Sequence, residues 1–267
     1  MNTSEKKFSI LCSNRIVKAF WTLNEEMKPA YKVTFVREID ASAMDRLRQN
    51  ILRQTSVKPS YTAFVIKAAA MALQEYPYAN RALLGFSFWK RFVQFNRFDI
   101  TVAVERNVPN AESVVLADTI LECDKKSLAD LTGELVALSN ATEDSNPRWR
   151  LFYSLLSKVP VYFSKWLIRL PRLFPSMWAT HRGGACFVNS PAKYGIDFFI
   201  GDMLWPLTVT FGWVKERPIA IDGRVEVRRT VPLGLIFDRR IMAGAPAARF
   251  FTRIAYILEH ADEEIIM

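Results

Sequence analysis

Residues 212–240 read GWVKERPIAIDGRVEVRRTVPLGLIFDRR and indicate a β-hairpin. The runs IAI and RVEV flank Asp222-Gly223, and an Asp-Gly pair between β-rich runs is the strongest short-range signal for such a turn. The apolar run VPLGLIF follows and is typical of a strand buried in a core. This stretch therefore predicts a hairpin whose second strand continues into the interior and ends at Asp238.

The rest of the chain indicates helices and strands in irregular order. Ser60 is the expected cap of a buried helix that Pro77 closes. We expect strands at 31–40, 86–95, 98–105, 113–122, 185–190 and 207–214, and helices at 41–54, 61–76, 127–140 and 246–260. The order has neither a strict strand-helix-strand alternation nor an internal repeat. It predicts one α+β domain over residues 1–267, with a mixed β-sheet and packing helices.

Composition excludes several classes of protein. Half of the 267 residues are hydrophobic, so the chain can bury a large core and is not intrinsically disordered. Cys12, Cys123 and Cys186 are odd in number and widely spaced, which supports neither a disulfide framework nor a metal site. The apolar run at the start is too short for a secretory signal, and Lys or Arg interrupts every candidate spanning helix. We expect a cytoplasmic protein without a bound metal.

The positive charge is concentrated in one segment. The chain has 36 Lys and Arg against 27 Asp and Glu, a formal charge of +9. Between Ser145 and Tyr194 the sequence has eight of these cations and no acidic residue, so 28 cations and 27 anions remain elsewhere. The excess charge is therefore a property of this segment, not of the whole chain.

The same segment predicts a basic, apolar helical region at about 146–182. On a single helical wheel, Lys158, Lys165, Arg169 and Arg172 share one face, and Pro160 and Pro171 should divide the region into two or three short helices. The opposite face carries Leu151, Leu155, Leu156, Val159, Phe163, Trp166, Leu167 and Leu170. Helices of this composition lie in a membrane interface, so one interpretation is that about 147–180 binds anionic lipid. The other is that the apolar face packs on its own domain or on a neighbouring subunit. Nucleic-acid binding is not expected, because no recognition motif is present.

Several motifs together resemble a known family. They are KAAAMALQEYPYAN (67–80), FDITVAV (98–104), DKKSLADL (124–131), GGACFVNS (183–190), the 212–240 stretch and GAPAARFFTRIAYILE (244–259). In this order they resemble the catalytic domain of the dihydrolipoyl acyltransferase component of 2-oxo acid dehydrogenase complexes, which is related to chloramphenicol acetyltransferase. The resemblance extends from about residue 15 to 264. It implies a chloramphenicol acetyltransferase-like fold, a homotrimer or larger trimer-based assembly, and a coenzyme A thioester as substrate, with no covalently bound cofactor.

The resemblance also identifies where the chain departs from its family. In that family a His of one subunit is the general base, and a Ser of the next subunit stabilises the oxyanion. The family's Asp-His-Arg, two residues, Asp-Gly corresponds here to residues 238–244, with Arg239 in place of the His and Ala243 in place of the second Asp. A guanidinium stays protonated and cannot accept a proton, so Arg239 can bind an anion at most.

Other residues are weaker candidates for the chemistry. Ser190 keeps the position of the oxyanion-stabilising Ser, but it is equally consistent with a turn, since Pro191 departs from the family. His181 precedes the Ser190 strand and is a candidate substitute base, whereas His260 is expected to be solvated at a helix end. Cys186 is expected to pack as a small apolar residue.

Two functions from different classes follow from these observations. One is acyl transfer from a thioester donor, with diverged chemistry or a base from elsewhere. The other is a catalytically inactive trimeric scaffold or binding protein, associated with a membrane surface or lipid through its basic region. The sequence starts at the domain itself, so a swinging-arm role is not expected unless other chains supply the arm. Fold alone does not decide between these functions.

Overall fold

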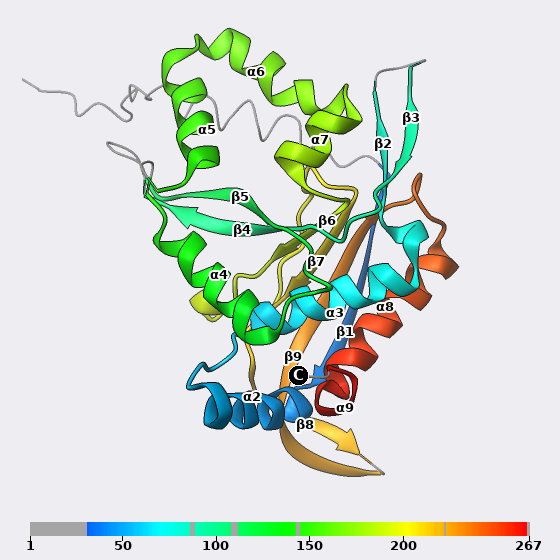
Figure 1. Ribbon diagram of the computed structural model, residues 1–267. Helices are drawn as coiled ribbons and strands as arrows, with labels where there is room; N and C mark the ends of the chain where they lie inside the picture. The colour runs from blue at the N-terminus through cyan, green and yellow to red at the C-terminus, as the bar shows by residue number, and fades with distance from the viewer. Residues whose placement is uncertain (1–30, 86–88, 108–111, 143–144, 222, 266–267) are drawn as a thin grey trace, which may run out of the picture.

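The computed structural model describes residues 31–85, 89–107, 112–142, 145–221 and 223–265 (Figure 1). Cys12 and the N-terminal run lie outside these residues. The strands are β1 (Lys32–Asp40), β2 (Arg81–Leu84), β3 (Arg91–Gln94), β4 (Ile100–Arg106), β5 (Val114–Ile120), β6 (Cys186–Asn189), β7 (Leu207–Phe211), β8 (Lys215–Ile221) and β9 (Arg224–Asp238). The helices are α2 (Ser42–Thr55), α3 (Tyr61–Glu75), α4 (Leu128–Asn140), α5 (Pro147–Lys158), α6 (Val161–Arg169), α7 (Pro175–Arg182), α8 (Gly244–Glu259) and α9 (Ala261–Glu264), with short 3-10 turns η1 (Pro77–Ala79), η2 (Leu170–Arg172) and η3 (Ala192–Tyr194).

Seven strands form one mixed sheet in the order β1-β9-β7-β6-β4-β5, with β8 paired to β9. The central pairs β4-β6 and β6-β7 are parallel, whereas β9 runs antiparallel to β1, β7 and β8. The first half of β9 pairs with β8, and its second half enters the core between β1 and β7. The predicted α+β class with a mixed sheet is confirmed.

The hairpin predicted around residues 222–223 is present. Ile221 pairs with Arg224, and Gly223 adopts a φ of 77°, which favours glycine because it has no Cβ. Asp222 itself lies outside the described residues. From this turn β9 runs for 15 residues, and its last nine are buried.

Helices α2, α3, α4 and α8 contribute to the main core on one face of the sheet (Figure 1). Ser60 caps α3, since its hydroxyl accepts a hydrogen bond from the Ala63 amide at 3.1 Å. Ser127 and Asp130 form a reciprocal capping box at the start of α4. In α2, the residues Ala43, Met44, Leu47 and Ile51 are buried, as their spacing predicts.

The basic region packs partly on the other face. Pro160 separates α5 from α6, and Pro171 lies in η2, so the predicted division at these two prolines is observed. Trp149 of α5 is buried against Val114 and Leu116 of β5. Trp178 of α7 packs with Phe187 of β6. The residues on either side of Phe187, Cys186 and Val188, belong to the main core on the opposite face of the sheet. Part of the apolar surface of this region is therefore covered by its own domain.

The apolar face predicted for the region is partly exposed in α6. The buried residues of α6 include Ser164 and Ile168, whereas Phe163 and Trp166 of the expected apolar face are exposed. Pro160 and the turn at η2 break the continuous helix on which a single helical wheel depends. Among the described residues, none of the helices is long and apolar enough to span a bilayer.

Strands β2 and β3 form a separate two-stranded finger (Figure 1). One long strand was expected at 86–95, but the structure has β3 only at 91–94 and adds β2. Residues 86–88 lie outside the described part. Gly85 ends β2 with a φ of 104°, so the chain turns there instead of extending.

Candidate functional site

The turn after β9 holds Asp238 and Arg240 in a fixed ion pair. The Asp238 carboxylate is buried and accepts hydrogen bonds from Arg240 Nε at 2.9 Å, from Arg240 Nη2 at 2.5 Å and from the Arg240 amide at 2.9 Å. The guanidinium carbon of Arg240 lies 4.6 Å from the centre of the Tyr31 ring. This bidentate geometry leaves Asp238 fully occupied, so its function here is to shape the turn.

Arg239 lies between these two residues and is exposed. Its amide donates to the Tyr31 carbonyl at 2.9 Å, which fixes its main chain at the rim of the sheet. Ala243 follows as the N-cap of α8 and offers no side-chain hydrogen bond to the helix. The exposed Arg239 side chain is thus a cation at the position where the resemblance places a His.

The Ser190 hydroxyl is engaged with the main chain. It donates to the Phe211 carbonyl at 2.8 Å and accepts from the Ala192 amide at 3.2 Å. A hydroxyl has a single hydrogen to donate, so this one is committed to Phe211. The arrangement supports the interpretation of Ser190 as a turn residue, and an oxyanion role would require breaking the bond to Phe211.

Ser190 and Arg239 do not meet within one chain. Ser190 follows β6 at the Phe211 end of β7, since Asn189 pairs with Thr210. Arg239 follows Asp238, whose amide bonds the Pro206 carbonyl at the other end of β7. The strand between these ends is about 13 Å long. A site that uses both side chains would need two subunits.

The two histidines and Cys186 have different surroundings in the described part of the chain. His181 is exposed in the last turn of α7. His260 stacks on the Tyr256 ring at 4.1 Å, and its Nδ1 lies 3.0 Å from the Tyr256 carbonyl oxygen. Cys186 is fully buried in the main core, and this burial raises the pKa of its thiol. Cys186 is therefore a packing residue, as expected from the sequence.

Lys32 is a candidate that the sequence patterns did not indicate. It begins β1 opposite Asp238 in the strand register, and its Nζ donates to the Trp205 carbonyl at 2.5 Å. Burial lowers the pKa of its ammonium group to about 8, although Asp238 and Asp202 oppose the shift. Only the register between β1 and β9 places this amine beside the Asp238 turn, which is why no local motif could reveal it.

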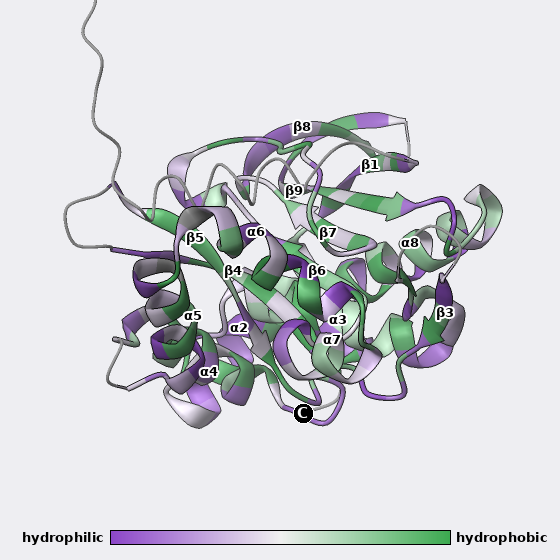
Figure 2. Cartoon of the chain, turned by 90° about the horizontal axis from the view of Figure 1, so that it is seen from above, coloured by the Kyte–Doolittle hydropathy of each residue, from purple (hydrophilic) through white to green (hydrophobic). Residues whose placement is uncertain are grey.

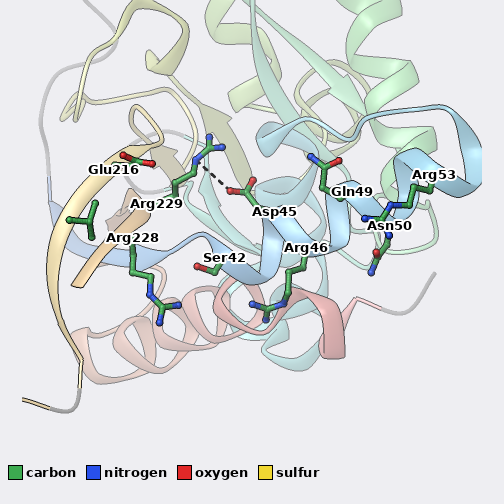
Figure 3. Close-up of a pocket in the computed structure, with 10 residues that line it drawn as sticks. Ser42, Asp45, Arg46, Gln49, Asn50, Arg53, Glu216, Arg228 and Arg229 are labelled. Carbon is green, nitrogen blue, oxygen red and sulfur yellow. Dashed lines mark ion pairs between the residues drawn. The ribbon is translucent and has the colours of Figure 1, made fainter. Parts of the chain in front are cut away.

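A separate concavity of about 580 Å³ lies between α2 and the β8–β9 hairpin (Figure 3). Four arginines line it, Arg46 and Arg53 from α2 and Arg228 and Arg229 from β9. Three of them are paired with carboxylates, such as Arg46 with Asp262 at 2.7 Å. The concavity adjoins the start of β9, whereas Arg239 follows its end, so the two places are distinct.

The sequence matches a family model over residues 15–148 and 179–266, the model for the 2-oxoacid dehydrogenases acyltransferase (catalytic domain). The chain belongs to this family. The match is interrupted between residues 148 and 179, a gap that includes α6, η2 and nearly all of α5.

Two kinds of relative agree with this assignment. The dihydrolipoyllysine-residue succinyltransferase component of the 2-oxoglutarate dehydrogenase complex from Haemophilus influenzae is 26% identical over 231 residues, which cover 85% of this chain and 48% of that protein. The lipoamide acyltransferase component of the branched-chain alpha-keto acid dehydrogenase complex from Bacillus subtilis is 23% identical over 234 residues, covering 85% of this chain and 46% of that protein. The chain thus spans about half the length of the curated relatives it matches.

Solved structures of the same family share the fold. A probable dihydrolipoamide acetyltransferase from Listeria monocytogenes has a TM-score of 0.69 at 21% identity, covering 98% of each chain. The cubic core of the pyruvate dehydrogenase multienzyme complex gives 0.69 at 18% identity, covering 97% of this chain and 95% of that one. The α+β architecture around β9 is therefore that of acyltransferase cores.

Proposed function

We propose that this protein is a trimer-based scaffold or binding protein that keeps the acyltransferase fold without its His-dependent chemistry. The observation that carries the proposal is Arg239, an exposed guanidinium in the place of the family's general base. Ser190, at the position of the family's oxyanion-stabilising Ser, also supports the proposal, because its hydroxyl donates its hydrogen to the Phe211 carbonyl. The separation of Ser190 and Arg239 within one chain supports an assembly in which neighbouring subunits bring such positions together.

The chemistry explains why a cation at residue 239 is unsuitable for acyl transfer. A thiol attacks a thioester as the thiolate, so a base with a pKa near the working pH must remove its proton. General-base catalysis contributes about 10²- to 10⁴-fold to such reactions. Arg239 cannot supply that step, but its donors can hold a carboxylate or a phosphate.

A turnover assay tests this proposal directly. Purified full-length protein is incubated with a series of acyl-CoA donors and with dithiol, amine and hydroxyl acceptors. We expect no turnover above the uncatalysed rate, and measurable thiol acylation by the Arg239→His/Ala243→Asp variant. Wild-type turnover that Ser190→Ala abolishes would show that the protein is an enzyme of the usual type.

Lys32 favours acyl transfer from a coenzyme A thioester as a second candidate function. An amine with a pKa near 8 is partly neutral at physiological pH and can accept a proton, unlike Arg239. If this candidate is correct, wild-type protein turns over acyl-CoA and Lys32→Met abolishes the activity. Lys125→Met is the matched control, because Lys125 is exposed and paired with Glu122 far along the chain from the Asp238 turn.

We also propose that the scaffold attaches peripherally to the cytoplasmic face of a membrane through residues 147–180. The supporting observation is α6, where Tyr162, Phe163 and Trp166 are exposed. Exposed aromatic rings beside Lys and Arg are typical of helices that lie in the headgroup region of a bilayer. Sedimentation of the protein with anionic vesicles tests this part, and protein that remains in the supernatant at low salt would contradict it.

A further inference from the structure

The β2–β3 finger (residues 81–85 and 89–94) is joined to the basic helical region. The Gly85 amide donates to the Arg172 carbonyl of η2 at 2.7 Å. Ala82 and Leu84 of the finger share a buried cluster with Trp178 of α7. In Figure 1 the finger and α6 both reach the upper end of the molecule. Two segments that are distant in sequence therefore form one end of the fold.

These two segments share an unusual charge pattern. Residues 76–98 contain four Lys or Arg and no acidic residue, and residues 145–196 contain eight and no acidic residue. The other residues of the chain have 24 cations and 27 acids. The whole positive excess of the protein therefore comes from two segments that contact each other. Carboxylates outside the two segments pair with some of these cations, such as Asp99 with Arg97 and Asp118 with Arg148.

Both segments also expose aromatic side chains. On the finger, Trp89 is 72% exposed and Phe92 is exposed beside Lys90 and Arg91. On the helical region, Tyr162 is 82% exposed, with Phe163, Trp166 and Phe174 also accessible. Figure 2 looks down on this end and shows hydrophobic and hydrophilic residues side by side on α6 and β3. Removing such rings from water is favourable, so the surface favours a partner with an apolar interior.

We infer that the finger and α6 together form one surface that binds bilayers containing anionic phospholipid. This inference rests on the proposed membrane attachment through residues 147–180 and adds the finger as a second point of contact. Anionic headgroups match the cations of both segments, and the boundary between headgroups and acyl chains suits exposed Trp and Tyr rings. The bond from Gly85 to Arg172 and the packing of Leu84 on Trp178 hold the finger in place relative to the helices.

Vesicle sedimentation of the full chain tests the inference. The probes are phosphatidylcholine vesicles with and without phosphatidylglycerol, at low and high salt, and polyglutamate as a soluble acidic competitor. The finger variant is Trp89→Ser/Phe92→Ser, and the helix variant is Tyr162→Ser/Trp166→Ser. The control is Val225→Ser/Val227→Ser, which removes two exposed apolar side chains from the β8–β9 hairpin. A charge variant, Lys90→Gln/Arg91→Gln, changes two exposed positions and leaves the aromatic rings of the finger in place.

We expect wild-type protein and the control to bind only vesicles with phosphatidylglycerol, and to be released by salt. The finger and helix variants should each lower the partition coefficient about tenfold or more, since each loses two rings. The charge variant should bind more weakly at low salt and lose less binding as salt is added. Circular dichroism and the sedimentation coefficient of each variant test whether its fold and assembly are unchanged.

Contrary outcomes separate the two proposals. Wild-type protein that ignores anionic vesicles would overturn both the membrane attachment and the role of the finger. Loss of binding in the helix variant, with wild-type binding by the finger and charge variants, would overturn the finger alone. Equal binding to neutral vesicles would overturn the anionic selectivity. Binding to polyglutamate but not to vesicles would identify an acidic protein as the partner instead.

Discussion

The hydroxyl of Ser190 donates its hydrogen to the Phe211 carbonyl, so this side chain joins the end of β6 to the end of β7. The same oxygen accepts from the Ala192 amide and closes the turn that leads into η3. A residue in this position stabilises the sheet whether or not the protein is an enzyme. Substituting Ser190 can therefore distinguish a structural role of this residue from a catalytic one.

The first prediction follows from that bond. Ser190→Ala should lower the free energy of unfolding by about 1–2 kcal/mol, because it leaves the partly buried Phe211 carbonyl without its donor. Urea denaturation measures the change, and Ser176→Ala, at an exposed position in α7, is the control with little expected effect. An unchanged midpoint for Ser190→Ala would mean that the bond to Phe211 is not maintained in solution.

The second prediction concerns the start of α8. Ala243 has the extended backbone of an N-cap, with φ −75° and ψ 169°, but no side-chain oxygen to accept from the first turn. Ala243→Asp should stabilise the protein by about 1 kcal/mol at neutral pH, and Ala243→Ser should do so as well. Thermal unfolding monitors the gain. Ala243→Leu supplies no oxygen and should give none, so equal stabilisation by Leu would contradict the capping explanation.

Much of the fold could be predicted because its signals are local. Ser60 and Ser127 identify helix starts through hydrogen bonds within three residues, and Asp222-Gly223 identifies the hairpin through the backbone that a tight turn requires. The finger was missed as a hairpin because each strand has only four residues, too few for a clear period. The exposure of Phe163 and Trp166 in α6 could not be predicted from a helical wheel, because a wheel does not show whether its apolar face has a packing partner.

The candidate site was less predictable because it depends on contacts between distant segments. The resemblance identified Arg239 and Ser190, and their positions at opposite ends of β7 became evident only from the sheet order. Lys32 gained its lowered pKa from burial beside Trp205 and from its register with Asp238. No spacing along the chain encodes a cross-strand neighbour that is about 200 residues away.

The third prediction is a pH dependence caused by Lys32. Its pKa of about 8 in the folded protein is below the 10.5 of an ordinary lysine, so the unfolded chain binds more protons between these values. Stability from this group therefore rises as pH increases from 8 towards 10.5. Relative to Lys32→Met, wild-type protein should gain roughly 1–3 kcal/mol between pH 7 and pH 10.

Paired urea denaturation curves of wild-type protein and Lys32→Met at several pH values measure this difference, because the other titrating groups are common to both. Lys125→Met is the control. Lys125 pairs with Glu122, which raises the pKa of its ammonium group. The difference in unfolding free energy between wild-type protein and Lys125→Met should therefore stay constant over the same pH range. A flat difference for Lys32→Met would show that Lys32 is solvated in solution.

The last prediction tests the turn of the finger with two glycines. Gly85 has a φ of 104°, and a Cβ there would lie 2.0 Å from the Trp89 carbonyl oxygen. Gly85→Ala should therefore destabilise the protein by about 1–3 kcal/mol or more, through backbone strain and this contact. Gly133 lies within α4, and a Cβ there would meet no atom within 4 Å. Gly133→Ala should instead stabilise the helix by about 1 kcal/mol. Thermal unfolding of both variants measures whether each one raises or lowers the unfolding temperature. Stabilisation by Gly85→Ala would contradict the conformation of the turn through which the finger contacts η2.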